Sequence, residues 1–359
     1  MEIQMGDMIG TYAAYSKDEK LRSESSSGGV FSLLAEKVLH RAGVVYGAAM
    51  SQDCKNAEFI RIDKEEELSK LRGSKYLQAR VGNTYRQVKA DLESGIPVLF
   101  SGTGCQVNGL RGFLGKGYGN LYCVDVVCHG VPSPKLWSRY VQNIEKEANA
   151  KLISVNFRCK DVSWEDFGIK KIDSTHRDMY ISKDKDPYML MFLRDYCLRP
   201  SCYECAVKQQ KLADITIGDF WGINHVFPEM NDGKGISLVI VRTDQGSELF
   251  HCIGTDIVFK EVSYEDGVRE NSAEYSSVRR PEERNDFFDD MAAMDFKELE
   301  NKYAMPAPVS FKKKIKKLIK KIILKSPFSK FIFGGGYKVN GQTYGMRFIF
   351  EDRTAWKER

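Results

Sequence analysis

The chain has 359 residues, of which 42% are hydrophobic and 29% charged, an ordinary globular composition with room for about two domains. Its formal net charge is +5, but residues 311–325 hold eight lysines and no acid, and removing these eight charges leaves −3. Nucleic-acid binding normally needs a basic patch on the folded domain, so the charge argues against nucleic acid as the main partner. No apolar run approaches the ~20 residues of a membrane span, and residues 1–15 lack signal-peptide features, so we expect a cytoplasmic protein.

The first half of the chain alternates between predicted helices and strands. Apolar periodicity and apolar runs predict six elements: helix 28–40, strand 44–50, helix 83–92, strand 97–101, helix 106–114 and strand 121–127. Strands separated by helices are typical of an α/β fold. We expect a mainly parallel or mixed sheet flanked by helices, with ligands at the carboxyl edge of its strands.

The second half is less regular. A long amphipathic helix is predicted after Pro134, ending near Ala150, and strands are predicted over residues 152–157, 215–219 and 237–243 around a cysteine-rich connection. From residue 304 onward lysines and aliphatic residues interleave, and no internal repeat is found. We predict three regions: an N-terminal region (1–95), a central region (96–303) that carries the cysteines as a second subdomain, and a basic C-terminal appendage (304–359).

Three cysteines, Cys197, Cys202 and Cys205, fall within nine residues. Cytosolic thiols stay reduced, so clustered cysteines indicate a metal centre more often than disulfides. Their spacing is that of plant-type [2Fe–2S] ferredoxins, but the downstream candidate for a fourth ligand, Cys252, lies far off. A structural zinc site usually shows two close pairs, and only Cys202 with Cys205 is present. Neither local pattern fits by itself.

A site assembled from distant segments fits better. Cys105 lies between a predicted strand and a helix, and Cys128 follows the end of the next strand. In a parallel sheet these positions fall on one edge, so Cys105, Cys128, Cys202 and Cys205 can converge as four ligands. The role of Cys197 stays open between a ligand and a core residue. Buried inert thiols are expected at the other positions, which are Cys54, Cys123, Cys159 and Cys252.

Two turns rich in glycine and hydroxyl groups precede helices, residues 25–29 and 102–104. Free N–H groups at a helix start can bind an anion, but neither turn matches the Rossmann or Walker pattern, and an N-cap with a tight turn is the commoner role. Between them, residues 72–78 offer Lys75 beside a hydroxyl and an aromatic ring. Phosphate pairing and a solvated surface lysine both stay open for Lys75.

Six segments in order resemble the coenzyme F420 hydrogenase/dehydrogenase beta-subunit family. They are SSGGVF (26–31), GSKY (73–76), VLFSGTGCQ (98–106), VVCHGVPS (126–133), CYEC (202–205) and ADITIGDFWG (213–222). The resemblance implies one [4Fe–4S] cluster on Cys105, Cys128, Cys202 and Cys205, with Cys197 outside the pattern. It also implies that the N-terminal region 1–95 is the flavin-binding part, with an FAD held by residues of the glycine and lysine segments, namely Ser27, Gly28, Gly29, Ser74, Lys75, Tyr76 and Thr103.

The resemblance implies an oxidoreductase that passes electrons between a hydride donor, F420-like or nicotinamide, and a one-electron partner. Gly104 stands where the family usually has proline, which we expect to loosen the turn. The chain has no Cys-x2-Cys-x2-Cys-x3-Cys-Pro module, so a separate electron carrier or oxidoreductase subunit is expected. A hydrogen-bonded structural role is expected for His129. The alternative is a non-enzymatic, zinc-stabilised binding module associated with surface-polysaccharide synthesis.

Residues 311–325 place isoleucine and leucine at helical spacing, with lysines covering the other face. A short cationic amphipathic helix of this kind can lie on an anionic membrane. We therefore expect peripheral contact with the inner face of the membrane. A helix packed on the protein's own surface or on a partner is the alternative.

Overall fold

This computed structural model describes residues 8–305, 337–339 and 342–344. Residues Met1–Pro306 belong to one compact unit and Ala307–Arg359 to a second. In the second unit, β13 (Tyr337–Val339) and β14 (Gln342–Tyr344) pair in antiparallel fashion. The basic segment 311–325, with its expected amphipathic helix, lies outside the described residues.

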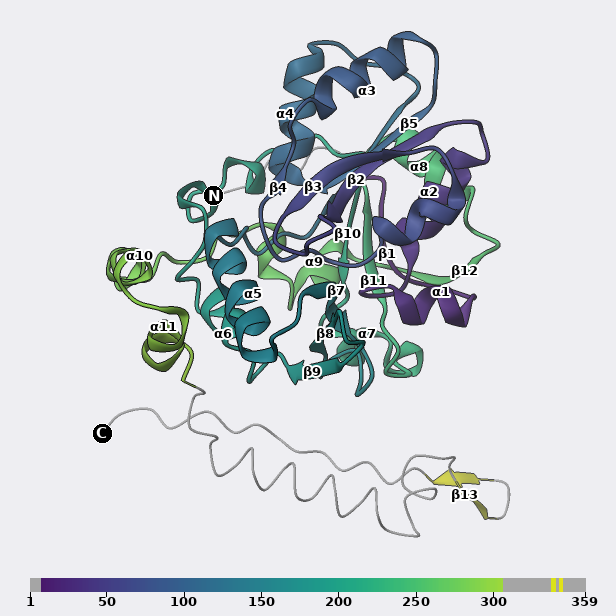
Figure 1. Cartoon of the computed structure of the whole chain (residues 1–359). Coiled ribbons are helices and arrows are strands. Elements are labelled where there is room, and N and C mark those ends of the chain that lie inside the picture. The colour runs from purple at the N-terminus through teal and green to yellow at the C-terminus, as the bar shows by residue number, and fades with distance from the viewer. Residues whose placement is uncertain (1–7, 306–336, 340–341, 345–359) are drawn as a thin grey trace, which may run out of the picture. The chain divides into compact units, whose positions relative to one another are not determined.

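A nine-stranded sheet forms the centre of the first unit (Figure 1). Its strands are β1 (Gly10–Ser16), β2 (Val44–Met50), β3 (Ala57–Ile62), β4 (Ala79–Arg80), β5 (Val98–Thr103), β6 (Leu121–Val126), β10 (Ile215–Asp219), β11 (Ser237–Val241) and β12 (Ile257–Val262). The spatial order is β12-β1-β11-β10-β6-β5-β2-β3-β4. Strands β2, β5, β6 and β10 run parallel, whereas β1, β11 and β12 are joined by antiparallel pairs. The expected α/β fold with a mixed sheet is confirmed.

Helices cover both faces of this sheet because successive strand residues point to opposite sides. On one face, α2 (Val30–Leu39) and α8 (Asp244–His251) bury apolar residues against side chains such as Leu99. On the other, α3 (Thr84–Glu93) and α4 (Gly104–Leu114) pack on the neighbouring residues of β5, Val98 and Phe100. The short helix α1 (Glu19–Glu24) follows β1.

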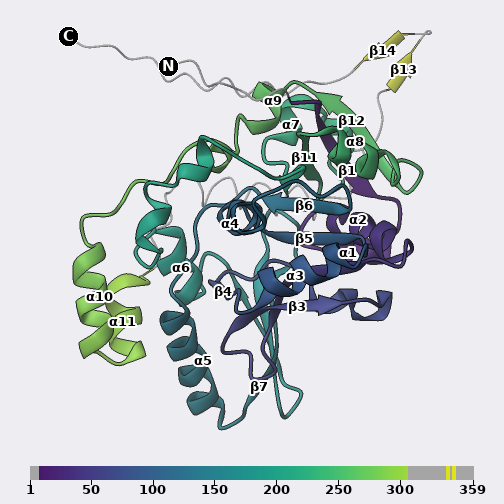
Figure 2. The ribbon, with the colours of Figure 1, turned by 90° about the horizontal axis from the view of Figure 1, so that it is seen from above.

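A second apolar core lies beside the sheet. It joins a three-stranded sheet, β7 (Leu152–Cys159), β8 (Gly168–Asp173) and β9 (Asp178–Ser182), to four helices, α5 (Pro134–Ala148), α6 (Pro187–Leu193), α10 (Arg284–Ala293) and α11 (Phe296–Tyr303). Aromatic side chains fill its centre, with the rings of Trp137 and Phe157 4.7 Å apart and those of Trp137 and Tyr188 4.8 Å apart. Figure 2 shows the four helices grouped at one side of the unit.

Short elements complete the unit. They are α7 (Ile223–Val226), α9 (Tyr264–Val268) and the 3-10 turns η1 (Glu65–Lys70), η2 (Pro200–Cys202), η3 (Ala206–Lys208), η4 (Pro228–Met230) and η5 (Ser272–Glu274). No helix among the described residues is both long and apolar enough to cross a membrane. Strands from both predicted regions, 1–95 and 96–303, share the large sheet, so the division at residue 95 stays a prediction from the sequence.

Candidate functional site

Two of the predicted metal-ligating cysteines leave the same edge of the sheet. Strands β5 and β6 pair in parallel with Thr103 opposite Val126. Cys105 and Cys128 each lie two residues beyond this pair, Cys105 in the first turn of α4 and Cys128 in the connection that follows β6. The register of the sheet therefore places the two cysteines side by side, as expected from the strand pattern.

The cysteine-rich loop is held against this edge by backbone contacts. Pro132 and Leu198 form an isolated antiparallel bridge, and the Arg199 amide donates to the Val131 carbonyl at 3.0 Å. The Val131 amide in turn donates to the sulfur of Cys202 at 3.5 Å. These contacts bring η2, with Cys202, to the segment that carries Cys128.

The far end of the loop is tied to α4. The side chain of Asn108 donates to the Gln210 carbonyl at 2.8 Å and accepts from the Leu212 amide at 3.1 Å. Lys208, in η3, donates through Nζ to the Cys128 carbonyl at 2.7 Å. The loop therefore closes over the start of α4, and Cys205 lies between its two anchored ends.

The four thiols influence one another electrostatically. The pKa of Cys128 is raised to about 12, mainly by burial and in part by the nearby thiols of Cys202 and Cys105, against the lowering effect of Lys208. Burial also raises the pKa of Cys202, with added contributions from Cys105 and Cys205. The four residues therefore form one neighbourhood. Within residues 8–305, however, no three Cys, His, Asp or Glu side chains converge closely enough to share a single metal ion.

The remaining cysteines lie elsewhere. Cys197 is fully buried in the aromatic core, which supports a packing role rather than a ligand role. Buried positions are found for Cys54, Cys123 and Cys159, as expected. The expectation of burial is wrong for Cys252, which is exposed at the end of α8 and accepts a hydrogen bond from Arg41 at 3.0 Å.

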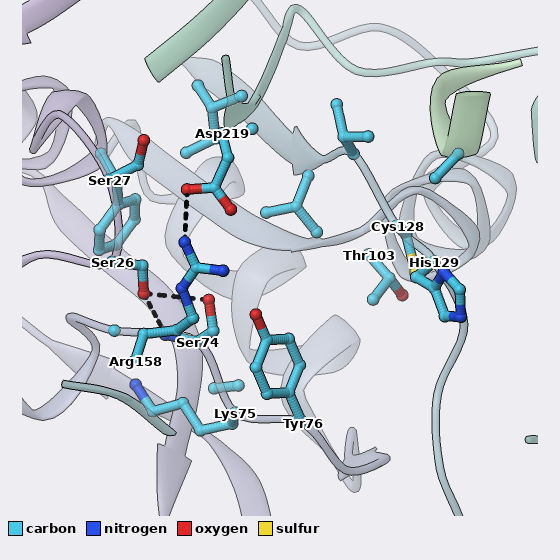
Figure 3. A pocket seen from close by; sticks show the side chains of 18 of the residues that line it. Ser26, Ser27, Ser74, Lys75, Tyr76, Thr103, Cys128, His129, Arg158 and Asp219 are labelled. Atoms are coloured by element: carbon cyan, nitrogen blue, oxygen red, sulfur yellow. Dashed lines mark hydrogen bonds and ion pairs between the residues drawn. The ribbon is translucent and has the colours of Figure 1, made fainter. Parts of the chain in front are cut away.

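A cavity of about 650 Å³ opens beside the cysteines (Figure 3). Its volume lies in the range of about 300–1,000 Å³ that is usual for small-molecule sites. Six of the seven predicted flavin-binding residues line it, together with Cys128 and His129: Ser27, Gly29, Ser74, Lys75, Tyr76 and Thr103. Segments far apart in the sequence thus share one cavity wall with a predicted metal ligand.

The seventh predicted residue, Gly28, is placed against the sheet instead. Its amide donates to the Ser237 hydroxyl at 3.0 Å, and a Cβ atom there would lie only 2.4 Å from the Ala14 carbonyl oxygen. Close packing explains this glycine. The adjacent Gly29 has φ +88° and precedes the first residue of α2, so it supplies the left-handed turn by which the helix begins.

The two loops that carry the predicted flavin residues are joined through hydroxyl groups. The Ser74 amide donates to Ser26 Oγ at 2.8 Å, and the two hydroxyl oxygens are 3.0 Å apart (Figure 3). The Ser27 hydroxyl donates to the Ile236 carbonyl at 2.7 Å. Lys160 donates to the Ser27 carbonyl at 3.1 Å. The serine loop is therefore fixed before any ligand binds.

Lys75 is hydrogen-bonded within the chain rather than solvated, and its pairing with a phosphate stays a prediction. Its ammonium donates to three carbonyl oxygens at the end of η1, those of Lys70 at 3.1 Å, Leu71 at 2.8 Å and Arg72 at 3.0 Å. Burial lowers the pKa of Lys75 to about 7, whereas the three acceptors favour its charged form. The side chain fixes the loop that lines the cavity.

Arg158 is a cavity residue that the sequence did not reveal. It follows the predicted strand 152–157, is 4% exposed, and pairs with Asp219 at 2.9 Å (Figure 3). Its guanidinium stacks over the Phe167 ring at 3.8 Å from the centroid, and the Trp164 indole also donates to Asp219 at 2.9 Å. The pair gives one cavity wall a buried cation with an aromatic face. Of these two residues, only Asp219 lies in one of the six segments that carry the family resemblance.

His129 also lines the cavity and lies 2.6 Å from Asp195, measured from Nε2 to Oδ1. The edge of its ring meets Phe192 at a centroid distance of 5.3 Å. This is the hydrogen-bonded histidine that the sequence led us to expect. Asp195 has φ +63°, so an unusual backbone conformation presents its carboxylate to the histidine.

Gly104 allows the cysteine loop to pack on α4. A Cβ atom there would lie 2.5 Å from Val207 Cγ1 and 2.8 Å from Asp125 Oδ2, so glycine makes close packing possible rather than merely loosening the turn.

Gly104→Ala is expected to lower the free energy of unfolding by about 1–3 kcal/mol, through overpacking. Urea unfolding measures this change in the free energy of unfolding. Gly112→Ala in the same helix meets no atom within 4 Å and is the control; equal stabilities of the two variants would contradict the packing role.

Comparisons with known proteins show the family of the chain. The chain matches the coenzyme F420 hydrogenase/dehydrogenase family twice, with the N-terminal domain of its beta subunit over residues 11–84 and with the C-terminal domain over residues 97–266. No curated protein matches. A chain of the F420-reducing [NiFe] hydrogenase complex from Methanosarcina barkeri shares the fold, with a TM-score of 0.51 at 17% identity over 75% of this chain and 88% of that chain. The protein therefore belongs to the coenzyme F420 hydrogenase/dehydrogenase beta-subunit family.

Proposed function

We propose that the protein is an electron-transfer oxidoreductase that binds FAD in the cavity and a [4Fe–4S] cluster on Cys105, Cys128, Cys202 and Cys205. It would pass electrons between a hydride donor, F420-like or nicotinamide, and a one-electron partner. The observation that carries this proposal is the position of Cys128, which lines the same cavity as the predicted flavin residues and lies near the thiols of Cys202 and Cys105. Family membership supports an oxidoreductase role.

The cysteine set suits a cluster better than one zinc ion. Four sulfurs on one zinc stand about 3.8 Å apart, given Zn–S bonds of about 2.3 Å. No such convergence occurs among the described residues. In a four-iron cluster each thiolate binds a different iron, so the ligands stand further apart. Bound iron would also offset the burial that raises the pKa of Cys128 to about 12.

The cavity suits a dinucleotide. The first residues of α2, Val30 and Phe31, line it, and the first amides of a helix have no partner within the helix, so they favour a pyrophosphate. Because the Ser27 hydroxyl and the Gly28 amide already have partners, we assign the pyrophosphate to the amides that follow them. Tyr76 supplies an aromatic wall next to Arg158.

When bound, a flavin accepts two electrons as hydride and an iron–sulfur cluster passes them singly. The chain's own residues position these groups. The Thr103 hydroxyl lies 3.2 Å from the Cys105 sulfur, and the Val131 amide donates to the Cys202 sulfur. Hydrogen bonds to ligating sulfurs stabilise their negative charge and raise the reduction potential. Lys75 and Ser26 hold the two loops on the cavity side.

Analysis of anaerobically purified protein tests the proposal. We expect about four irons, about four acid-labile sulfides and about one FAD per chain, with a broad visible band. One zinc without colour or flavin would instead support the alternative, a zinc-stabilised binding module associated with surface-polysaccharide synthesis.

A separate proposal concerns residues 311–325 and rests on the sequence alone. We propose that this basic segment contacts an anionic membrane, where each lysine near the surface adds about 1 kcal/mol at low salt. The intact chain should pellet with anionic liposomes and be released as salt rises, whereas a chain ending at Val309 should stay in the supernatant. Equal sedimentation of the two chains would reject membrane contact.

A further inference from the structure

We propose that Lys160 is a positioning residue for the phosphate groups of the cavity ligand. This residue follows β7 and holds the serine loop, which we define as residues 25–29, so that the amides at the start of α2 face the pyrophosphate. The proposal rests on the proposed function, because it assigns a role in holding the dinucleotide that is placed in the cavity.

One ammonium group joins three separate segments of the chain. Lys160 Nζ donates to the carbonyl oxygens of Arg22 at 2.6 Å, Ser27 at 3.1 Å and Lys234 at 2.8 Å. Arg22 lies in α1 just before the serine loop, Ser27 lies within the loop, and Lys234 lies in the connection that precedes β11. Lys160 itself directly follows β7, a strand of the second core. The serine loop is therefore tied to two other parts of the fold through one side chain.

The connection before β11 packs closely on the serine loop. Gly235 has φ +109°, and a Cβ atom there would lie 2.8 Å from the Ser27 carbonyl oxygen. Arg22 Nε also donates to the Gly235 carbonyl at 2.9 Å. Neither Lys160 nor residues 233–236 line the cavity, whereas four residues of the loop do, namely Ser25, Ser26, Ser27 and Gly29. Lys160 and this connection therefore hold the serine loop from the side that faces away from the cavity.

The peptide groups at the end of the loop have defined partners. The Gly28 amide donates to the Ser237 hydroxyl at 3.0 Å, and the Gly28 carbonyl accepts from the Ser16 amide at 2.7 Å. In a planar trans peptide the carbonyl and the amide point in opposite directions, so the Gly29 amide points away from Ser16. The Gly29 amide has no acceptor among the described residues, and the first amides of α2 follow it. These amides are free to bind phosphate oxygens.

Lys160 supplies a positive charge close to these amides. Its three acceptors are neutral carbonyls. The charged side chains around it pair with one another: Arg22 with Asp232 at 2.7 Å, Arg158 with Asp219 at 2.9 Å, and Lys234 with Glu19 at 2.6 Å. Burial, together with the charges of Arg22 and Arg158, lowers the pKa of Lys160 to about 8, although the three acceptors favour its charged form. Ser27 and Gly29 are two residues apart, so their Cα atoms are separated by at most about 7 Å. The ammonium therefore lies close enough to favour a phosphate at the Gly29 amide.

Lys160→Met removes the three hydrogen bonds and the charge but keeps a side chain of similar length. FAD carries a pyrophosphate and riboflavin carries no phosphate, so these two probes separate the phosphate site from the rest of the cavity. Fluorescence titration of flavin-free protein measures both dissociation constants. We expect Lys160→Met to bind FAD about ten-fold more weakly than wild type does, and riboflavin within about two-fold of wild type.

Lys234→Met is the matched control. Lys234 belongs to the same connection, but its side chain is exposed and pairs with Glu19, and the carbonyl that Lys160 contacts stays in place in this variant. Because surface ion pairs contribute little, both flavins should bind within about two-fold of wild type. Hydrogen exchange in ligand-free protein gives a second measurement. Peptides that cover residues 22–31 should exchange faster in Lys160→Met than in wild type, and at the wild-type rate in Lys234→Met.

An equal loss of affinity for FAD and riboflavin in Lys160→Met would show a general structural role and overturn the proposal. Unchanged exchange of the serine loop, or an equal loss of FAD affinity in Lys234→Met, would overturn it as well. Wild-type protein that binds neither flavin ends the proposed function and the phosphate role of Lys160 together. If wild type and Lys160→Met both bind FAD with the same preference over riboflavin, the Lys160 proposal ends alone.

Discussion

Replacing Cys128 or Cys202 with serine is expected to remove most of the iron, from about four to below one per chain, and to abolish the visible band. Cys128 is the thiol shared by the cavity and the cysteine group, and Cys202 is held beside it by the Val131 amide. A serine hydroxyl binds iron poorly, and three thiols do not hold a four-iron cluster firmly. Iron and sulfide analysis after anaerobic purification measures the loss.

Cys197→Ser is the matched control, because Cys197 belongs to the same cysteine-rich loop but lies fully buried in the aromatic core. This variant should keep its iron and its spectrum. If Cys202→Ser kept full iron while Cys197→Ser lost it, the third ligand would be Cys197, and the loop would have to turn differently from the structure described above.

Lys75→Met is expected to weaken FAD binding by about 10- to 100-fold. The ammonium makes three hydrogen bonds that hold the end of η1 against the loop with Ser74 and Tyr76, and hydrogen bonds to charged groups are worth about 1.5–3 kcal/mol each. These hydrogen bonds hold the cavity wall in the position that binds the ligand, so part of their energy contributes to FAD affinity. Fluorescence titration of flavin-free protein with FAD measures the dissociation constant.

Lys70→Met controls for the loss of one lysine from the same segment. Lys70 forms a surface ion pair with Glu67 at 2.6 Å, and such pairs contribute little. The affinity of the Lys70→Met protein for FAD should stay within about two-fold of wild type. A Lys75→Met protein that binds FAD as tightly as Lys70→Met would show that the loop does not depend on the ammonium.

Strands with continuous apolar runs could be predicted from the sequence. The predicted strands 44–50 and 215–219 have the bounds of β2 and β10, and the helix predicted over residues 106–114 begins two residues earlier as α4. The nearness of Cys105 and Cys128 could also be predicted, because a parallel register brings positions beyond neighbouring strands together. The contacts that hold the cysteine loop against residues 131–133 join distant segments and are seen only in the folded chain.

Contacts between distant segments could not be predicted. The role of Lys75 depends on three carbonyls whose orientation is set by η1, and a lysine in sequence carries no sign of this. Arg158 stands at the end of a strand without a motif, so its pairing with Asp219 appears only in the folded chain. Cys252 was expected to be buried because its neighbours are apolar, but it ends a helix at the surface.

An anaerobic reductive titration tests most directly whether a flavin and a cluster share this chain. The account predicts that about three electrons are taken up per chain, about two by the flavin and about one by the cluster, with both visible absorptions bleaching. Uptake of no electrons by a zinc-containing protein, or of about two electrons by a protein without iron, would contradict it.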